Sequence, residues 1–334
     1  HGLVYAVSEN GAVYALNANS GTIRWRFEMD RGRRGYLAVS HSRLYVGTED
    51  DRYTSVYALD SLSGGLLWRY DLDRHVLLPN ALPPSLPSST GAVLTADDDT
   101  VYFQAEIQKG GDLHLSTVYA LDAATGKERW HFTPNRGMGY HFFFSPSVDE
   151  RRVYVAVDRP PILYALDRST GTEVWRYEGN GAEQITNLVA IGERDVFFTT
   201  TEVGERGYVC ALDREEGSLR WKTAVGQDVV HMTPPCTDGA QVYVGTGKGE
   251  VIAIDAATGL IRWNAAVRGA IVLAFPFSIA GESVYVPTAG LTAFTTDGSL
   301  LWQLGMGESA DILGSPAVVD GMIFVAAGRL MAIE

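Results

Sequence analysis

The chain has 334 residues, of which 46% are hydrophobic, so it can bury a sizeable core and is not intrinsically disordered. Its net charge of −13 argues against a nucleic acid partner, which would require a basic surface. The longest apolar stretch, residues 270–280, contains Pro276 and is too short to span a membrane. Two cysteines, Cys210 and Cys236, are too few for a disulfide scaffold and are expected to be buried free thiols.

The chain is organised around one repeated phrase, which follows a short apolar strand expected at residues 3–7. In chain order its copies are VYALNANSGTIRW ending at Trp25, VYALDSLSGGLLW at Trp68, VYALDAATGKERW at Trp130, LYALDRSTGTEVW at Trp175, VCALDREEGSLRW at Trp221, VIAIDAATGLIRW at Trp263 and the shorter LTAFTTDGSLLW at Trp302. Successive tryptophans are 39 to 62 residues apart. A period of this length with strand-like composition predicts a propeller built from four-stranded blades.

Each period is expected to contain four strands, which we call A, B, C and D. In one period they are predicted at residues 142–148, 153–157, 162–166 and 173–177, where apolar residues alternate and turn-forming residues intervene. Only B and C strands, at 3–7 and 12–17, precede Trp25. After Trp302 come an A strand at 312–319, a B strand at 322–326 and a C strand at 329–333.

The predicted fold class is therefore all-β, an eight-bladed β-propeller of four-stranded antiparallel blades. It is expected to form one domain over residues 1–334, in which the first blade lacks its A strand and the last blade lacks its D strand. A seven-bladed propeller is the alternative, but it leaves two C-terminal strands without a place. The chain begins almost directly on a strand, as expected of a trimmed or mature fragment.

The phrase itself has a physical explanation. Its Asp and Ser/Thr side chains can bond to local backbone amides in a turn, and its glycine can adopt a left-handed conformation without steric cost. The tryptophan four residues later opens strand D, where its ring can cover the adjacent blade while its N–H reaches a carbonyl. The predicted structural docking residues are Trp25, Trp68, Trp130, Trp175, Trp221, Trp263 and Trp302.

The pattern A-x-D-x-x-[ST]-G-x-x-x-W resembles the tryptophan-docking repeat of the quinoprotein-like β-propeller superfamily, and the resemblance covers essentially the whole chain. That group includes dehydrogenases that use pyrroloquinoline quinone (PQQ), BamB-like outer-membrane assembly proteins and sensor domains of bacterial Ser/Thr kinases. The resemblance implies an eight-bladed propeller and favours a periplasmic or other extracytoplasmic location. The copies depart from the pattern at Asn17, Glu216, Thr295 and Asp297, which are expected to weaken individual turns.

Enzymatic chemistry is not expected. In the PQQ dehydrogenases a disulfide between adjacent cysteines covers the quinone, whereas Cys210 and Cys236 are far apart in sequence. The repeated aspartates, Asp60, Asp122, Asp167, Asp213 and Asp255, hold a fixed turn position and are predicted to be caps, not catalytic acids. The seven histidines show no metal-ligand spacing, so no metal site is predicted. No cofactor is expected, with PQQ in a quinoprotein dehydrogenase as the alternative.

The remaining variation lies in the D–A and B–C loops, which emerge at one end of the blades. Two insertions, predicted at residues 71–90 and 107–116, fall there, and insertions on a rigid scaffold often carry binding function. The predicted binding residues at this end are Arg33, Arg34, His75, Tyr140, His141 and His231. They suit a protein partner or a small ligand. The predicted function is thus a non-catalytic scaffold for protein interaction or a ligand-sensing domain, such as the extracytoplasmic part of a Ser/Thr kinase.

Overall fold

The computed structural model describes residues 2–8, 10–30, 35–50, 53–73, 94–108, 114–134, 145–157, 161–181, 183–185, 188–202, 206–226, 232–272, 275–305, 314–319, 321–326 and 330–333. These residues form 31 β-strands, and no helix occurs among them. Accordingly, none of the described segments is a helix long and apolar enough to cross a membrane.

The chain divides into two compact units, residues 1–155 with 165–174, and residues 156–164 with 175–334. Three sheets lie within the first unit. They are β1 (Leu3–Val7), β2 (Ala12–Asn17) and β3 (Ile23–Glu28); β4 (Gly35–Ser40), β5 (Arg43–Glu49), β6 (Tyr53–Asp60) and β7 (Leu66–Asp73); and β8 (Leu94–Ala96), β9 (Thr100–Gln108), β10 (His114–Asp122) and β11 (Glu128–Phe132). The fourth sheet takes residues from both units and consists of β12 (Ser147–Val148), β13 (Arg152–Val157), β14 (Ile162–Asp167) and β15 (Glu173–Glu178).

Four further sheets lie within the second unit. The fifth has β16 (Glu183–Ile185), β17 (Ala190–Ile191), β18 (Asp195–Glu202), β19 (Arg206–Asp213) and β20 (Leu219–Gly226); the sixth has β21 (Cys236–Thr237), β22 (Gln241–Gly245), β23 (Glu250–Asp255) and β24 (Ile261–Ala266). The seventh has β25 (Ser278–Ala280), β26 (Ser283–Pro287), β27 (Gly290–Thr295) and β28 (Leu300–Gly305); the eighth has β29 (Ala317–Val319), β30 (Met322–Ala326) and β31 (Leu330–Ile333).

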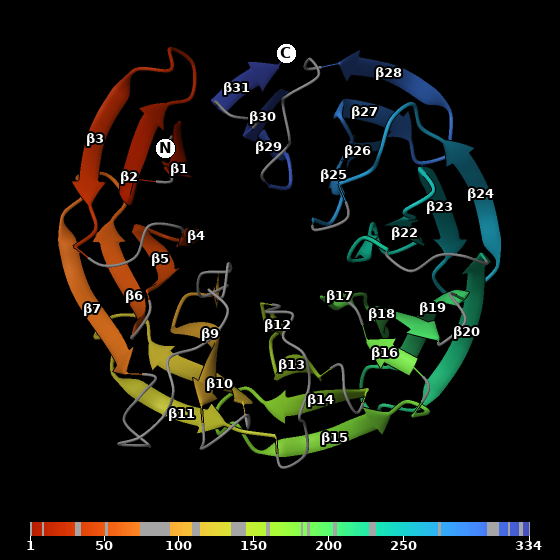
Figure 1. Cartoon of the computed structure of the whole chain (residues 1–334), viewed down its shortest axis with the longest axis horizontal. Coiled ribbons are helices and arrows are strands. Elements are labelled where there is room, and N and C mark those ends of the chain that lie inside the picture. The colour runs from red at the N-terminus through yellow and green to blue at the C-terminus, as the bar shows by residue number, and fades with distance from the viewer. Residues whose placement is uncertain are drawn as a thin grey trace. The chain divides into compact units, whose positions relative to one another are not determined.

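The sheets are antiparallel meanders, and the predicted eight-bladed β-propeller is confirmed. The first sheet has only B, C and D strands and the eighth only A, B and C, as far as the described residues go. The eighth sheet also shows that the seven-bladed alternative is wrong. Within the first unit the D strands β3, β7 and β11 follow one another along one side of their sheets, as β20, β24 and β28 do within the second (Figure 1).

Two details differ from the predicted strands. Residues 107–116 were expected to be an inserted loop, but β9 and β10 extend into this segment and pair Ile107 with Leu115. The reason is that both flanks keep an alternating pattern, which lets the hairpin lengthen. The fifth sheet has a second A-side strand, because β16 pairs with the far end of β18 while β17 pairs with its near end.

The hydrophobic core lies between consecutive sheets. Between the first and second sheets, Val13, Ala15 and Trp25 pack with buried residues of β5 and β6. In each of six C strands, the alanine of the repeated phrase lies opposite the tryptophan of strand D and the register shifts immediately afterwards; these alanines are Ala15, Ala58, Ala120, Ala211, Ala253 and Ala293. A small side chain at this position leaves room for the large indole on the neighbouring strand.

Candidate functional site

The tryptophans make one recurring contact between consecutive sheets. Each of six indole N–H groups donates a hydrogen bond to a backbone carbonyl in the C–D turn of the next sheet. That carbonyl belongs to the residue after the turn aspartate, or after Thr295 in the seventh sheet. The pairs are Trp25 with Ser61, Trp68 with Ala123, Trp130 with Arg168, Trp175 with Arg214, Trp221 with Ala256 and Trp263 with Thr296, at 2.9–3.1 Å. One geometry therefore joins successive sheets within each unit.

The turn glycine of the next sheet completes this contact. Gly171 has φ of 71°, and a methyl group placed on it would lie 2.5 Å from the Cε3 atom of Trp130. The same close approach occurs at Gly64, Gly126, Gly217, Gly259 and Gly298, each against the tryptophan of the preceding sheet. Both the left-handed backbone and the lack of space for a side chain require glycine here.

The repeated aspartates bond to their own turns. In Asp122, Oδ1 accepts hydrogen bonds from the backbone amides of Ala124 and Thr125 and from the Thr125 hydroxyl. The side-chain hydrogen bond from Arg129, followed by that from Thr125, lowers the pKa of Asp122 to about 2. Hydrogen bonds from turn hydroxyls or an arginine likewise lower the pKa of Asp60, Asp167, Asp213 and Asp255. These carboxylates stay ionised and cap turns, so they are poorly suited to donate protons.

The predicted binding residues fall elsewhere. Arg33, Arg34, His75, Tyr140, His141 and His231 all lie outside the described residues, as does most of the predicted insertion at 71–90. The structure therefore does not report whether they come together. Of that insertion, residues 71–73 belong to β7.

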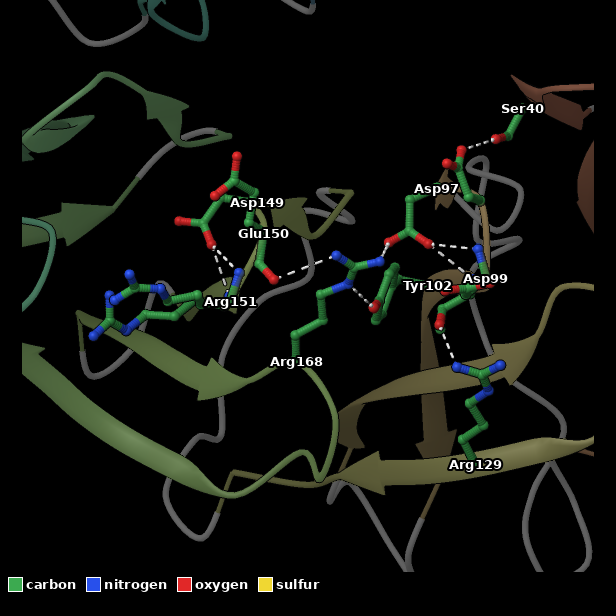
Figure 2. Close-up of polar contacts among 12 residues, drawn as sticks. Ser40, Asp97, Asp99, Tyr102, Arg129, Asp149, Glu150, Arg151 and Arg168 are labelled. Atoms are coloured by element: carbon green, nitrogen blue, oxygen red, sulfur yellow. Dashed lines mark hydrogen bonds and ion pairs between the residues drawn. The ribbon is translucent and has the colours of Figure 1, made fainter.

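A polar network closes the boundary between the third and fourth sheets, which we call the third seam (Figure 2). Arg168, next to the fourth C–D turn aspartate, pairs through Nη2 with Asp97 Oδ2 at 2.9 Å and donates from Nε to the Tyr102 hydroxyl at 3.2 Å. Its Nη1 reaches the carbonyl of Glu150 at 3.4 Å. Within the third sheet, Arg129 Nη1 donates to Thr100 Oγ1 at 3.0 Å. The ion pair with Asp97 and the hydrogen bond to Tyr102 therefore join the fourth sheet to the third.

A second cluster lies in the fifth sheet, at the end that carries the D–A and B–C loops. Lys222 Nζ lies 2.8 Å from Glu183 Oε1, 3.3 Å from Glu202 Oε1 and 4.0 Å from the ring centre of Tyr208. The Tyr208 hydroxyl donates to Glu202 Oε2 at 2.9 Å. Glu183 is only 4% exposed, and its Oε2 atom is buried without a hydrogen-bond donor.

This cluster is held as an ion pair. Burial lowers the pKa of Lys222, but the hydrogen bond and charge of Glu183 outweigh burial, so its pKa lies above the usual value. The ammonium therefore stays protonated and is not a nucleophile or general base at neutral pH. Sequence reasoning missed the cluster because Glu183 reaches Lys222 only through β16, and no repeated spacing marks that strand.

Neither cysteine is reactive in this environment. Cys210 is fully buried, Cys236 is partly buried, and both are free thiols. Burial raises the pKa of each thiol to about 12. Within the described part of the chain, no group of three or more His, Cys, Asp or Glu side chains is placed to hold a metal ion.

Several solved structures are similar to this chain. BamB from Moraxella catarrhalis is 21% identical, covers 87% of this chain and 80% of its own, and has a TM-score of 0.65. A quinohemoprotein alcohol dehydrogenase, ADHIIG from Pseudomonas putida HK5, is 16% identical, covers 98% of this chain and 68% of its own, and scores 0.63. The designed protein Ika8 is 16% identical, covers 99% and 93%, and scores 0.74. These similarities show the fold alone.

The sequence itself gives a narrower assignment. A search of curated proteins finds no match. A family model described as outer membrane protein assembly factor BamB, however, matches residues 1–117, 114–190 and 162–334. The resemblance to PQQ-repeat propellers is thereby confirmed, and the chain belongs to the family of the outer membrane protein assembly factor BamB.

Proposed function

We propose that this chain is a non-catalytic, protein-binding scaffold that works in the periplasm, or a comparable extracytoplasmic space, in the assembly of outer membrane proteins. The observation that carries the proposal is the family match, which spans the chain from residue 1 to residue 334. It favours the scaffold over the ligand-sensing domain because the family is described by an assembly role.

The chemistry of the described residues supports the same proposal. The five repeated aspartates are committed to their turns with lowered pKa values, and Lys222 is held protonated by two glutamates. Neither set offers an acid and a base with pKa values separated for proton transfer. The described residues therefore support a role in binding over one in proton-transfer catalysis.

The experiment is a deletion of the gene in its source organism, followed by measurement of folded outer membrane β-barrel proteins in the envelope. We expect the folded amount to fall and to recover when the full-length protein is supplied. As a control, a variant with Trp175→Ala and Gly217→Ala should fail to restore it, because its sheets no longer dock. Unchanged levels of folded barrel proteins in the deletion strain would overturn the proposed function.

A further inference from the structure

A pocket of about 390 Å³ lies at the boundary between the sixth and seventh sheets, which we call the sixth seam. Its lining residues come from both sheets: Ala240, Gln241, Asp255, Arg262 and Trp263 from the sixth, and Thr296 and Asp297 from the seventh. The pocket is at the end of the sheets that carries the A–B and C–D turns. This is the opposite end from the loops in which the sequence predicted binding.

The third seam shows what can occupy this place. Trp130 donates to the carbonyl of Arg168, and Trp263 donates to the carbonyl of Thr296, so Arg168 and Thr296 hold corresponding positions. At the third seam the arginine side chain crosses to Asp97 and Tyr102 of the preceding sheet (Figure 2). At the sixth seam a threonine is too short to do so.

The acceptors that Arg168 uses have counterparts at the sixth seam. Asp238 and Tyr243 occupy the positions of Asp97 and Tyr102, and in both turns the aspartate Oδ1 accepts two backbone amides. The Tyr243 hydroxyl donates to Asp238 Oδ2 at 2.7 Å. Gln241 Nε2 reaches the Tyr243 hydroxyl at 3.2 Å and the Thr296 carbonyl at 2.9 Å. At the sixth seam these side chains therefore bond to one another and to the Thr296 carbonyl, without an arginine among them.

The charge of the pocket favours a cation. Asp255 and Asp297 both have lowered pKa values and are ionised at neutral pH, whereas Arg262 supplies one positive charge. Arg262 is already committed, because its Nε and Nη2 atoms both donate to Asp255 Oδ2. Asp297 is exposed, and its Oδ1 accepts hydrogen bonds from the Thr295 hydroxyl and the Ser299 backbone amide. The lining thus carries one uncompensated negative charge.

We propose that the sixth-seam pocket binds the guanidinium group of an arginine side chain presented by the protein partner. The group would lie in the pocket with the Asp297 carboxylate and the Gln241 side-chain oxygen, both from lining residues, as acceptors. Arginine suits the site better than lysine, because a planar guanidinium can bond two oxygens and lie against the Trp263 ring. The source of the arginine rests on the proposed function; the binding itself does not.

The test uses N-acetyl-arginine methylamide as the probe and follows the indole N–H signal of Trp263 by NMR. We expect a saturable shift with a millimolar dissociation constant. The corresponding citrulline derivative, which has the same shape without the charge, should give no saturable shift. Asp297→Asn should weaken binding by up to about fivefold, the range of an exposed ion pair. Thr296→Arg should abolish binding, because its own guanidinium fills the pocket.

Ala124→Arg is the matched control, since it adds the same charge to an exposed position of a different C–D turn and should leave binding unchanged. Equal shifts from the arginine and citrulline probes, no saturable shift from either, or full binding by the Thr296→Arg variant would overturn the proposal. So would saturable binding of N-acetyl-glutamate in place of the arginine probe, because Arg262 would then be the receptor. An arginine site that persists when the deletion strain assembles barrel proteins normally would refute only the proposed function.

Discussion

The third and sixth seams share one docking geometry but differ in the side chains that lie beside it. At both seams the indole N–H of a tryptophan donates to a backbone carbonyl in the C–D turn of the next sheet. A glycine of that turn, with a left-handed backbone, lies against the indole ring. At the third seam Arg168 of the fourth sheet reaches Asp97 of the third, whereas at the sixth seam Gln241 of the sixth sheet reaches the Thr296 carbonyl of the seventh and a pocket lies beside it. The comparison teaches that the repeated residues hold the sheets together, while the side chains beside them differ from seam to seam.

The largest effect should come from removing the docking ring. Trp130→Ala should reduce the free energy of unfolding by about 3–5 kcal/mol, because the indole is 8% exposed and its loss leaves a cavity. Trp263→Ala should cost less, since that ring borders the open pocket. Urea denaturation of both variants measures the difference. A loss below about 1 kcal/mol for Trp130→Ala would contradict the docking role.

The turn glycine should come next. Gly171→Ala should cost about 2–4 kcal/mol, from the left-handed backbone and from collision with the Trp130 ring. Gly21 has φ of +66° at the same turn position but nothing within 4 Å of an added methyl group. Gly21→Ala should therefore show only the backbone cost, about 1–2 kcal/mol. Equal losses in the two variants would mean that the ring contact contributes nothing.

The bridging arginine should matter less. Arg168→Thr, which copies the sixth seam, should reduce stability by about 1–2 kcal/mol, because an ion pair and a hydrogen bond to Tyr102 are lost. Thr296→Arg, the reverse change, should raise the melting temperature slightly. Thermal unfolding of both variants checks this. A stabilising Arg168→Thr would show that the bridge does not fasten the third seam.

The capping aspartate should give the smallest change. Asp122→Ala should cost about 1 kcal/mol, whereas Asp122→Asn should cost little, because Asn17 makes the same turn hydrogen bonds in the first sheet. Since the folded pKa of about 2 lies below the ordinary value, the carboxylate stabilises the fold above about pH 4. That contribution is lost as the pH falls towards 2. Asp122→Asn should remove this part of the acid sensitivity, and an unchanged acid transition would disprove it.

Much of the fold could be predicted from the sequence because its signals are local. The turn residues, the glycine and the tryptophan lie within one phrase, so blade number and strand order follow from counting copies. The departures Thr295 and Asp297 were visible too, but they were expected only to weaken a turn. In fact the Thr295 hydroxyl bonds to Asp297 Oδ1, which caps the shortened turn.

The candidate sites could not be predicted in the same way. Arg168 lies in the fourth phrase, whereas Asp97 lies outside the repeated phrases, and no sequence spacing indicates that their side chains meet across a seam. Lys222 and Glu183 meet only because β16 adds to the fifth sheet. The pocket of the sixth seam is lined by residues of two successive sheets, among them Trp263 and Thr296, and neither repeated phrase alone indicates it.

The most direct test of a non-catalytic scaffold is an assay for quinone-dependent turnover. The purified full-length protein is titrated with PQQ, with and without Ca²⁺, and alcohol oxidation is then followed with an electron-accepting dye. A PQQ-dependent dehydrogenase assayed in parallel serves as the positive control. We expect no dye reduction above that of PQQ and Ca²⁺ alone. Saturable PQQ binding with Ca²⁺-dependent alcohol oxidation, abolished by chelation, would show instead that the chain is a quinoprotein dehydrogenase.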